Sequence, residues 1–488
     1  MSFQDGLQLQ TVLFCVCNAL VIWRYHERKE SEGGGVKIMS AESIRHSIQN
    51  HTIRKAMVYL EDNPEENIPK LMDLIDRISP EGWFTGQRDA FRKAIQEKNN
   101  WYELILRVYQ IDPGIRKRSL QNLIINATLT GGVLQKTLSE KYNCNVPWAI
   151  LLDPTSACNM HCKGCWASEY GNHMNLSYAL MDSIVNQGKH MGTYIYLFTG
   201  GEPLIRKKDI IRLCEEHPDC MFMAFTNGTL IDDAFCEEML RLKNLLTAIS
   251  MEGFEQTNDA RRGKGSFRKI QSKMEMLKEY GIPFGISTCY TSQNIDDVSS
   301  SEYFEMMIES GAFFVWFFHY MPVGGDADTE LLPRPEQREK MYVNIQKYRQ
   351  TKPIFTIDFQ NDGKYAGGCI AGGRKYIHIN ANGDIEPCAF IHYSDSNIHE
   401  DSLLEAYRKP LFMAYHDRQP FNENMLKPCP MLENPECIED IIKNTMAVNT
   451  DTIHPEDITQ LCSKTKPYAA AWGDTAEKLW AEMFEKGL

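Results

Sequence analysis

The chain has 488 residues, which is too long for a single hydrophobic core, so we expect two or three domains. Its 43% hydrophobic and 24% charged residues are typical of a folded soluble protein. The formal net charge of −13 argues against nucleic acid as the main partner, because binding a polyanion requires a basic surface.

The cysteine content is high for a chain that shows no secretory signal. Fifteen cysteines are spread unevenly, and three of them fall in one short stretch. An odd number in such a pattern is not typical of a disulfide framework. Thiolate ligands in a reducing compartment explain it better, and we therefore expect a cytoplasmic protein.

Residues 1–38 form a leader of doubtful status. Their apolar run, within residues 7–23, is shorter than the roughly 20 residues that span a bilayer, and it is followed by Arg24 and Arg28. Two interpretations stay open. The run associates with a membrane surface, or the functional chain begins near Met39.

Residues 40–138 are predicted to form a helical accessory domain. Apolar residues recur there at spacings of three and four, as at Ile68, Leu71, Leu74 and Ile78, with prolines between the segments.

From Trp148 the pattern becomes that of an α/β fold. Short apolar runs at 148–153, 194–199, 220–226, 246–251, 284–290 and 313–320 alternate with amphipathic stretches. The stretches predict helices at 176–190, 209–216, 232–242, 266–279, 301–310 and 336–348. Six β–α repeats imply a parallel sheet with right-handed crossovers. Sites on such folds lie where strands end and helices begin.

After residue 355 the chain becomes rich in glycine and cysteines return. Asn382-Gly383, flanked by alternating residues, predicts a hairpin. Residues 355–440 are expected to form a cysteine-containing extension, and residues 441–488 a polar helical tail.

The cysteine triplet Cys158, Cys162 and Cys165 directly follows the first predicted strand. A zinc site would need paired C-x2-C segments or a nearby histidine as the fourth ligand. His161 is too close in sequence to the cysteines to complete the same tetrahedral coordination easily. Three unliganded thiols on one loop would be reactive. A 4Fe–4S cluster held by three thiolates keeps one iron open, as a site that binds substrate or cofactor does.

The C-x3-C-x2-C spacing after a first strand resembles the signature of the radical S-adenosylmethionine (radical SAM) enzymes. This resemblance implies a partial (β/α)6 TIM-like barrel over residues 144–350, with SAM as the fourth ligand of the cluster. One departure is visible, because the family often has an aromatic residue where this chain has Gly164. Trp166, just after the third cysteine, is expected to take over that packing.

The resemblance extends to further motifs at strand ends. Gly200, Gly201 and Glu202, with Pro203, match the G-G-E-P segment that aligns the SAM amino group in the family. By similar matches, Ser250 and Arg262 would contact the SAM carboxylate or ribose, and Asn294 is a further cofactor-binding candidate. A turn hydroxyl and a surface salt bridge are the structural alternatives for Ser250 and Arg262.

Four later cysteines, Cys369, Cys388, Cys429 and Cys437, resemble a SPASM/twitch extension, which binds auxiliary 4Fe–4S clusters. The full set of seven cysteines is absent, so one auxiliary cluster is expected, with zinc as the alternative.

By this resemblance the protein is expected to cleave SAM reductively, form a 5′-deoxyadenosyl radical and abstract hydrogen from a peptide, lipid or small molecule. A reductant such as ferredoxin or flavodoxin would supply the electron. The alternative function is a non-catalytic iron–sulfur electron-transfer or binding protein. Tyr196, Tyr290, Trp316, His319 and Tyr320 are candidate pocket residues, with His319 and Tyr320 favoured, and core packing is the alternative. Cys289 is a candidate hydrogen donor, with buried packing as the main interpretation.

Overall fold

The computed structural model describes residues 65–70, 73 and 85–485. The leader at residues 1–38 and most of residues 40–84 lie outside the described residues. The interpretations of the leader therefore stay predictions. Within the described part, no helix has the length and apolar character needed to cross a membrane.

Six strands occur where the sequence predicted them, and five more follow. They are β1 (Ala149–Leu152), β2 (Ile195–Phe198), β3 (Met221–Thr226), β4 (Leu245–Ser250), β5 (Phe284–Tyr290), β6 (Phe314–His319), β7 (Phe355–Asp358), β8 (Tyr376–Ile379), β9 (Ile385–Glu386), β10 (Tyr393–Ser394) and β11 (Val448–Asn449).

The helices before and within the sheet region surround these strands. They are α4 (Thr85–Glu97), α5 (Asn100–Val108), α6 (Pro113–Leu120), η2 (Gln121–Gly131), α7 (Gly132–Tyr142), η3 (Trp166–Tyr170), α8 (Tyr178–His190), η4 (Pro203–Arg206), α9 (Lys207–Glu216), α10 (Asp233–Leu242), α11 (Glu255–Arg262), α12 (Ser266–Glu279), α13 (Ile295–Val298), α14 (Ser301–Glu309), η5 (Thr329–Leu331) and α15 (Pro335–Thr351). The later helices are α16 (Gly363–Ala366), α17 (Leu403–Ala406), α18 (Pro410–Arg418), α19 (Pro435–Lys443) and α20 (Ile458–Glu485).

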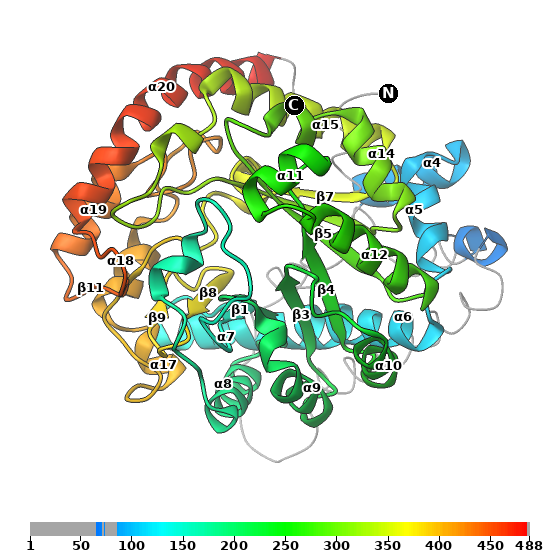
Figure 1. Cartoon of the computed structure of the whole chain (residues 1–488), viewed down its shortest axis with the longest axis horizontal. Helices are drawn as coiled ribbons and strands as arrows, with labels where there is room; N and C mark the ends of the chain where they lie inside the picture. Colours follow the sequence, from blue (N-terminus) through cyan, green and yellow to red (C-terminus); the bar gives the residue numbers. More distant parts are fainter. Residues whose placement is uncertain (1–64, 71–72, 74–84, 486–488) are drawn as a thin grey trace, which may run out of the picture.

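The main sheet is mostly parallel, as expected, and contains nine strands in the order β7-β6-β5-β4-β3-β2-β1-β8-β9. Every neighbouring pair from β7 to β8 is parallel, and only β9 is antiparallel. Helices such as α8, α9, α10 and α12 lie along the outer side of these strands (Figure 1). The carboxyl ends of β1 to β6 therefore meet at one edge, where a site can form.

Residues 355–440 do not form a layer of their own. β7 extends the sheet beside β6, and β8 pairs in register with β1, joining Leu151 to His378. The hairpin at Asn382-Gly383 connects β8 to β9, as predicted, with Gly383 at φ +90°. The cysteine-containing extension therefore lies directly against the first strand of the barrel-like sheet.

The C-terminal helix α20 is more than a polar tail. It packs against α19 and α15, and Trp472 is completely buried with its indole N–H donated to the Leu426 carbonyl at 2.9 Å. Figure 1 shows α20 following the rim of the molecule from α19 toward α15. One apolar face, interrupted by exposed polar residues, explains why the segment looked polar in sequence.

Candidate active site

The three cysteines of the triplet lie on the loop between β1 and η3, at the carboxyl end of β1. All three are partly buried. Burial, reinforced by the neighbouring thiols of Cys165 and Cys162, raises the pKa of Cys158 to about 11. The structure thus brings the three thiols near one another on one loop, which we call the cysteine loop (residues 154–165).

The donor set of the cysteine loop fits an iron–sulfur cluster. Within residues 65–70, 73 and 85–485, no group of three or more His, Cys, Asp or Glu side chains is arranged to hold a metal ion. A cubane cluster, by contrast, holds its thiolates apart on separate irons. Thiolate donors and nearby cations, described below, are what a negatively charged cluster requires.

Gly200 and Gly201 let the end of β2 lie against the start of the cysteine loop. The Gly201 N–H donates to the Thr155 carbonyl at 3.0 Å, and the Glu202 N–H donates to the Ala157 carbonyl at 2.8 Å. A Cβ on Gly200, whose φ is +95°, would lie 2.5 Å from the Thr155 oxygen, and one on Gly201 would overlap the Ala157 oxygen. Both glycines are therefore needed for this close approach.

The Glu202 carboxylate is fully buried between the ends of β2 and β3. Its Oε1 accepts hydrogen bonds from the Thr226 hydroxyl at 2.7 Å and the Leu204 N–H at 3.0 Å, and its Oε2 accepts one from the Asn227 N–H at 2.7 Å. Burial raises the pKa of Glu202, and these donors oppose that shift. A carboxylate offers about four acceptor positions, and these donors occupy three of them.

Two arginines at the end of α11 share the buried carboxylate of Glu252. Arg262 Nε and Nη2 lie 3.0 and 2.5 Å from Glu252 Oε1, and Arg261 Nη1 lies 2.8 Å from Oε2. Arg262 Nη1 is also 3.9 Å from Cys162 Sγ. Two guanidinium groups on one carboxylate leave a net positive charge beside the cysteine loop.

Arg261 also fixes the backbone of the cysteine loop. The Lys163 N–H donates to the Arg261 carbonyl at 2.9 Å, and Arg261 Nε donates to the Lys163 carbonyl at 3.2 Å. Arg262 was predicted from the sequence as a cofactor-binding candidate, whereas Arg261 and Glu252 were not. Their position next to Arg262 and two residues after Ser250 was the available signal.

Comparison with known proteins agrees with this arrangement. Residues 152–301 match the model of the Radical SAM superfamily. The chain contains a radical SAM domain. The match spans the cysteine loop, the Gly200-Gly201-Glu202 segment and both arginines.

Curated relatives align with about half of the chain. An AdoMet-dependent heme synthase of Methanosarcina barkeri is 24% identical over 297 residues, covering 54% of this chain and 82% of that protein. The sporulation killing factor maturation protein SkfB of Bacillus subtilis is 26% identical, covering 57% of this chain and 69% of that protein. The mycofactocin maturase MftC of Mycolicibacterium smegmatis is 28% identical, covering 50% and 65%.

A solved structure shares the fold. Streptococcus suis SuiB, in its crystal structure with S-adenosylmethionine, superposes with a TM-score of 0.51 at 20% identity, covering 62% of this chain and 77% of SuiB. This likeness confirms the α/β radical SAM fold that the sequence predicted.

The remaining predicted cofactor residues of the radical SAM domain have different surroundings. Ser250 ends β4 and is partly buried. The Asn294 side chain is fully engaged: its Oδ1 accepts from the Thr291 N–H at 2.6 Å, and its Nδ2 donates to the carbonyls of Glu252 at 3.2 Å and Cys289 at 2.9 Å. Asn294 therefore braces the segment that holds Glu252.

The prediction that His319 lines a pocket is wrong. His319 is 1% exposed, its Nδ1 donates to the Tyr320 carbonyl at 2.6 Å, and its Nε2 is 2.7 Å from the Tyr468 hydroxyl. Burial and the nearby Arg338 hold the pKa of His319 well below its ordinary value. Tyr320, Tyr196 and Tyr290 are also buried in the core. Burial by α20, which the sequence did not reveal, explains the difference at His319.

A different aromatic group faces the inner side of the sheet. Along β6, Trp316 and Phe318 are partly exposed while Val315 and Phe317 are buried. The rings of Trp316 and Phe318 stack with their centroids 5.7 Å apart, and the ring centroid of Phe225 in β3 lies 5.4 Å from that of Trp316. Trp316 is thus the one candidate of the predicted pocket set that remains partly exposed.

The four later cysteines surround a common core. Tyr415 is fully buried, and its pKa is raised well above its ordinary value by burial and then by Cys369, Cys388, Cys429 and Cys437 together. The Tyr376 hydroxyl lies 2.7 Å from Cys388 Sγ. Cys369 and Cys388 flank the β8–β9 hairpin, Cys429 lies on the loop before α19, and Cys437 lies in the first turn of α19, so the fold gathers residues far apart in sequence.

Proposed function

We propose that this chain is a radical SAM enzyme that holds a 4Fe–4S cluster through Cys158, Cys162 and Cys165. The observation that supports this most directly is the backbone contact between the cysteine loop and Gly201-Glu202. It places the thiols beside the buried carboxylate of Glu202. The net positive charge at Arg262, 3.9 Å from Cys162, would offset the charge of the cluster.

The bound cluster and SAM would supply one-electron cleavage to a 5′-deoxyadenosyl radical, which takes a hydrogen atom from the substrate. The residues of this chain would orient the cofactor. The remaining acceptor position of Glu202 would take a hydrogen bond from the SAM ammonium group, and Arg262 and Ser250 would contact its carboxylate or ribose. Asn294 would act indirectly by holding the Glu252 segment.

We further propose that the substrate presents an apolar or aromatic group to the barrel interior. The partly exposed rings of Phe225, Trp316 and Phe318 give such a group a contact surface. SkfB is named a maturation protein, and another SuiB structure is described as bound to a precursor peptide. A peptide is therefore our first substrate class, with a heme-related compound as the second because of the heme synthase.

Cys369, Cys388, Cys429 and Cys437 are proposed to hold one auxiliary 4Fe–4S cluster. Four thiolates would close its coordination, so this cluster would conduct electrons or brace the fold and would not bind SAM. A low-potential donor such as ferredoxin or flavodoxin is the proposed reductant.

The test is anaerobic reconstitution with iron and sulfide, followed by dithionite and SAM. Formation of 5′-deoxyadenosine is the expected result. Iron uptake with no 5′-deoxyadenosine would favour the alternative, an iron–sulfur electron-transfer or binding protein. Precursor peptides and iron porphyrins, added separately, would then distinguish the two substrate classes by mass spectrometry of the products.

A further inference from the structure

His378 of β8 is a completely buried imidazole that lies between two carboxylates. Its Nε2 is 3.1 Å from Asp153 Oδ1, and its Nδ1 is 2.6 Å from Glu386 Oε2. A neutral imidazole has only one N–H, so it would turn a lone pair toward one of these carboxylates. Nδ1 is hydrogen-bonded to Glu386, whereas the contact between Nε2 and Asp153 is at ion-pair distance without hydrogen-bond alignment. The imidazolium form is therefore the one that both carboxylates stabilise.

The two carboxylates hold the two ends of the cysteine loop. Asp153 directly precedes the loop, and it also accepts a hydrogen bond from the Thr199 hydroxyl at 2.6 Å at the end of β2. Glu386 Oε2 accepts a second hydrogen bond, from the Tyr170 hydroxyl at 2.7 Å, and Tyr170 ends the helix that follows the loop. His378 therefore connects both ends through one cation.

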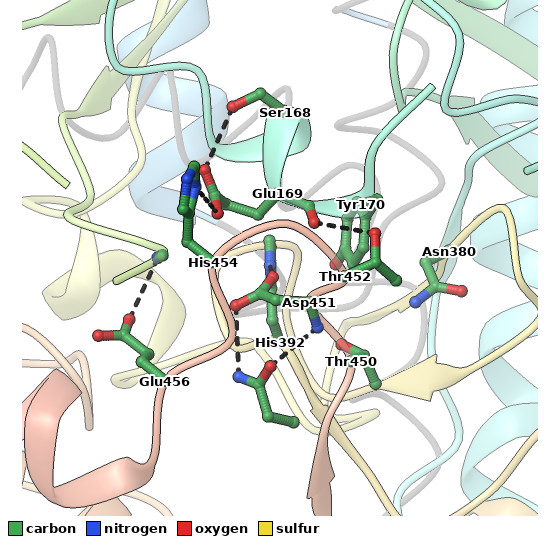
Figure 2. A network of polar contacts seen from close by, with 12 residues as sticks. Ser168, Glu169, Tyr170, Asn380, His392, Thr450, Asp451, Thr452, His454 and Glu456 are labelled. Carbon is green, nitrogen blue, oxygen red and sulfur yellow. Dashed lines mark hydrogen bonds and ion pairs between the residues drawn. The ribbon is translucent and has the colours of Figure 1, made fainter. Parts of the chain in front are cut away.

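Aromatic rings and a second histidine–carboxylate pair pack around this arrangement. The Trp166 ring, directly after Cys165, packs edge-on against His378 at 5.7 Å. The Tyr170 ring stacks on His392 at 4.3 Å, and His392 Nδ1 is 2.5 Å from Asp451 Oδ1. Figure 2 shows Tyr170, His392 and Asp451 close together, beside Thr450 and Thr452 of the segment that follows β11.

A contact between Asp153 and the turn at Gly200 connects the His378 ion pairs to the candidate cofactor-binding residues. A Cβ on Gly200 would lie 2.9 Å from the Asp153 Cβ, so this turn packs directly on the Asp153 side chain. A shift of Asp153 would therefore move the turn that presents Glu202.

We propose that His378 is a positioning residue of the radical SAM site. As a buried cation between Asp153 and Glu386, it clamps both ends of the cysteine loop and keeps the loop in register with the Gly200-Gly201-Glu202 turn. The proposal rests on the proposed function, because the expected effect of His378 is on the affinity of the site for SAM.

The test compares four variants of the reconstituted full chain. His378→Met has similar bulk without charge, His378→Lys keeps a cation, Tyr170→Phe removes one anchor, and His173→Met is an exposed-histidine control. Measured quantities are iron content, the midpoint of thermal unfolding, and the change that SAM causes in the electron paramagnetic resonance spectrum of the reduced cluster. Titrating that change gives the SAM affinity.

We expect His378→Met to weaken SAM binding about tenfold or more, since a charged hydrogen-bond pair is lost, with iron content near wild type. His378→Lys should recover most of the affinity, Tyr170→Phe should show a smaller loss, and His173→Met should show none. A general loss of stability would not separate Lys from Met in this way.

Two results would overturn the proposal: wild-type SAM affinity in His378→Met, or equal weakening in the Lys and Met variants. If His378→Met does not fold, Tyr170→Phe decides, and an unchanged SAM affinity there rejects the clamp. Absence of 5′-deoxyadenosine from the wild-type enzyme would reject the proposed function instead, so the two failures are distinguishable.

Discussion

Arg338 of α15 and Glu433 form a completely buried ion pair, with Nη1 2.7 Å from Oε1. Arg338 also donates to Asn361 Oδ1 at 2.9 Å, and its guanidinium lies 4.2 Å from the centre of the Trp472 ring. Glu433 Oε2 accepts the N–H of Cys429 at 2.6 Å. One pair of residues thus joins α15, α20 and the loop that carries Cys429.

Glu433→Gln should lower the free energy of unfolding by about 3–5 kcal/mol, because it leaves a buried guanidinium without a counter-charge. Urea unfolding of the metal-free chain measures this change. The exposed pair Lys340–Asp296 provides the control, since Asp296 is 87% exposed and Asp296→Asn should cost less than about 1 kcal/mol. An equal, small effect of both substitutions would contradict the buried-pair argument.

Replacing any one cysteine of the triplet should abolish SAM cleavage. Cys158→Ala, Cys162→Ala and Cys165→Ala each remove one cluster ligand, and the loop contains no spare thiol. The yield of 5′-deoxyadenosine after dithionite reduction measures the loss. Cys236→Ala, at a buried position of α10, should retain cleavage. Wild-type yield from any of the three loop variants would reject the assignment.

Arg262→Ala should weaken SAM binding by about tenfold or more, because it removes a charged hydrogen bond to the carboxylate or ribose of SAM. The iron content should stay near wild type, because Arg262 is not a ligand of the cluster. Iron analysis and a SAM titration measure the two properties separately. Arg268, whose side chain is 77% exposed, gives the matched control Arg268→Ala. Parallel loss of iron and SAM would mean that Arg262 supports the loop only structurally.

A variant that lacks all three triplet cysteines should still take up about four irons per chain, held by Cys369, Cys388, Cys429 and Cys437. The physical reason is that four thiolates close the coordination of a cluster independently of SAM. Metal analysis and the visible absorption spectrum after anaerobic reconstitution measure this result. One zinc and no iron would show that the later cysteines form a structural zinc site.

The stabilising effect of His378 should disappear at high pH. Burial by itself lowers the pKa of His378, but Asp153 and Glu386 raise it from 6.5 to about 10. A raised pKa contributes stability that is complete below the unfolded value and is lost as pH rises through the folded value. The unfolding-temperature difference between wild type and His378→Met should therefore shrink between pH 6.5 and 10. The neighbouring groups Tyr170 and His392 are present in both proteins, so their own titration does not create the difference. A difference in unfolding temperature that stays constant up to pH 10.5 would contradict a positively charged His378.

Much of the fold could be predicted because its signals are local. The six apolar runs became β1 to β6, since a strand buried on both faces needs a continuous run of apolar residues. The hairpin at Asn382-Gly383 followed from the positive φ that a glycine allows. The six predicted helices of this region occur as α8, α9, α10, α12, α14 and α15 for the same reason. The sequence did not predict α11, because its apolar content is too low for a periodic pattern.

The candidate chemistry could be predicted from the order of residues alone: three thiols on one loop, the Gly200-Gly201-Glu202 turn after the next strand, and Arg262 beyond β4. Tertiary structure decided which groups meet. Only folding pairs β8 with β1, which places His378 next to Asp153, and only the packing of α20 buries His319. Arg261 and Glu386 gain their partners Lys163 and Tyr170 across 98 and 216 residues of chain. Such contacts depend on strand order and helix packing, and short-range spacing contains no information about them.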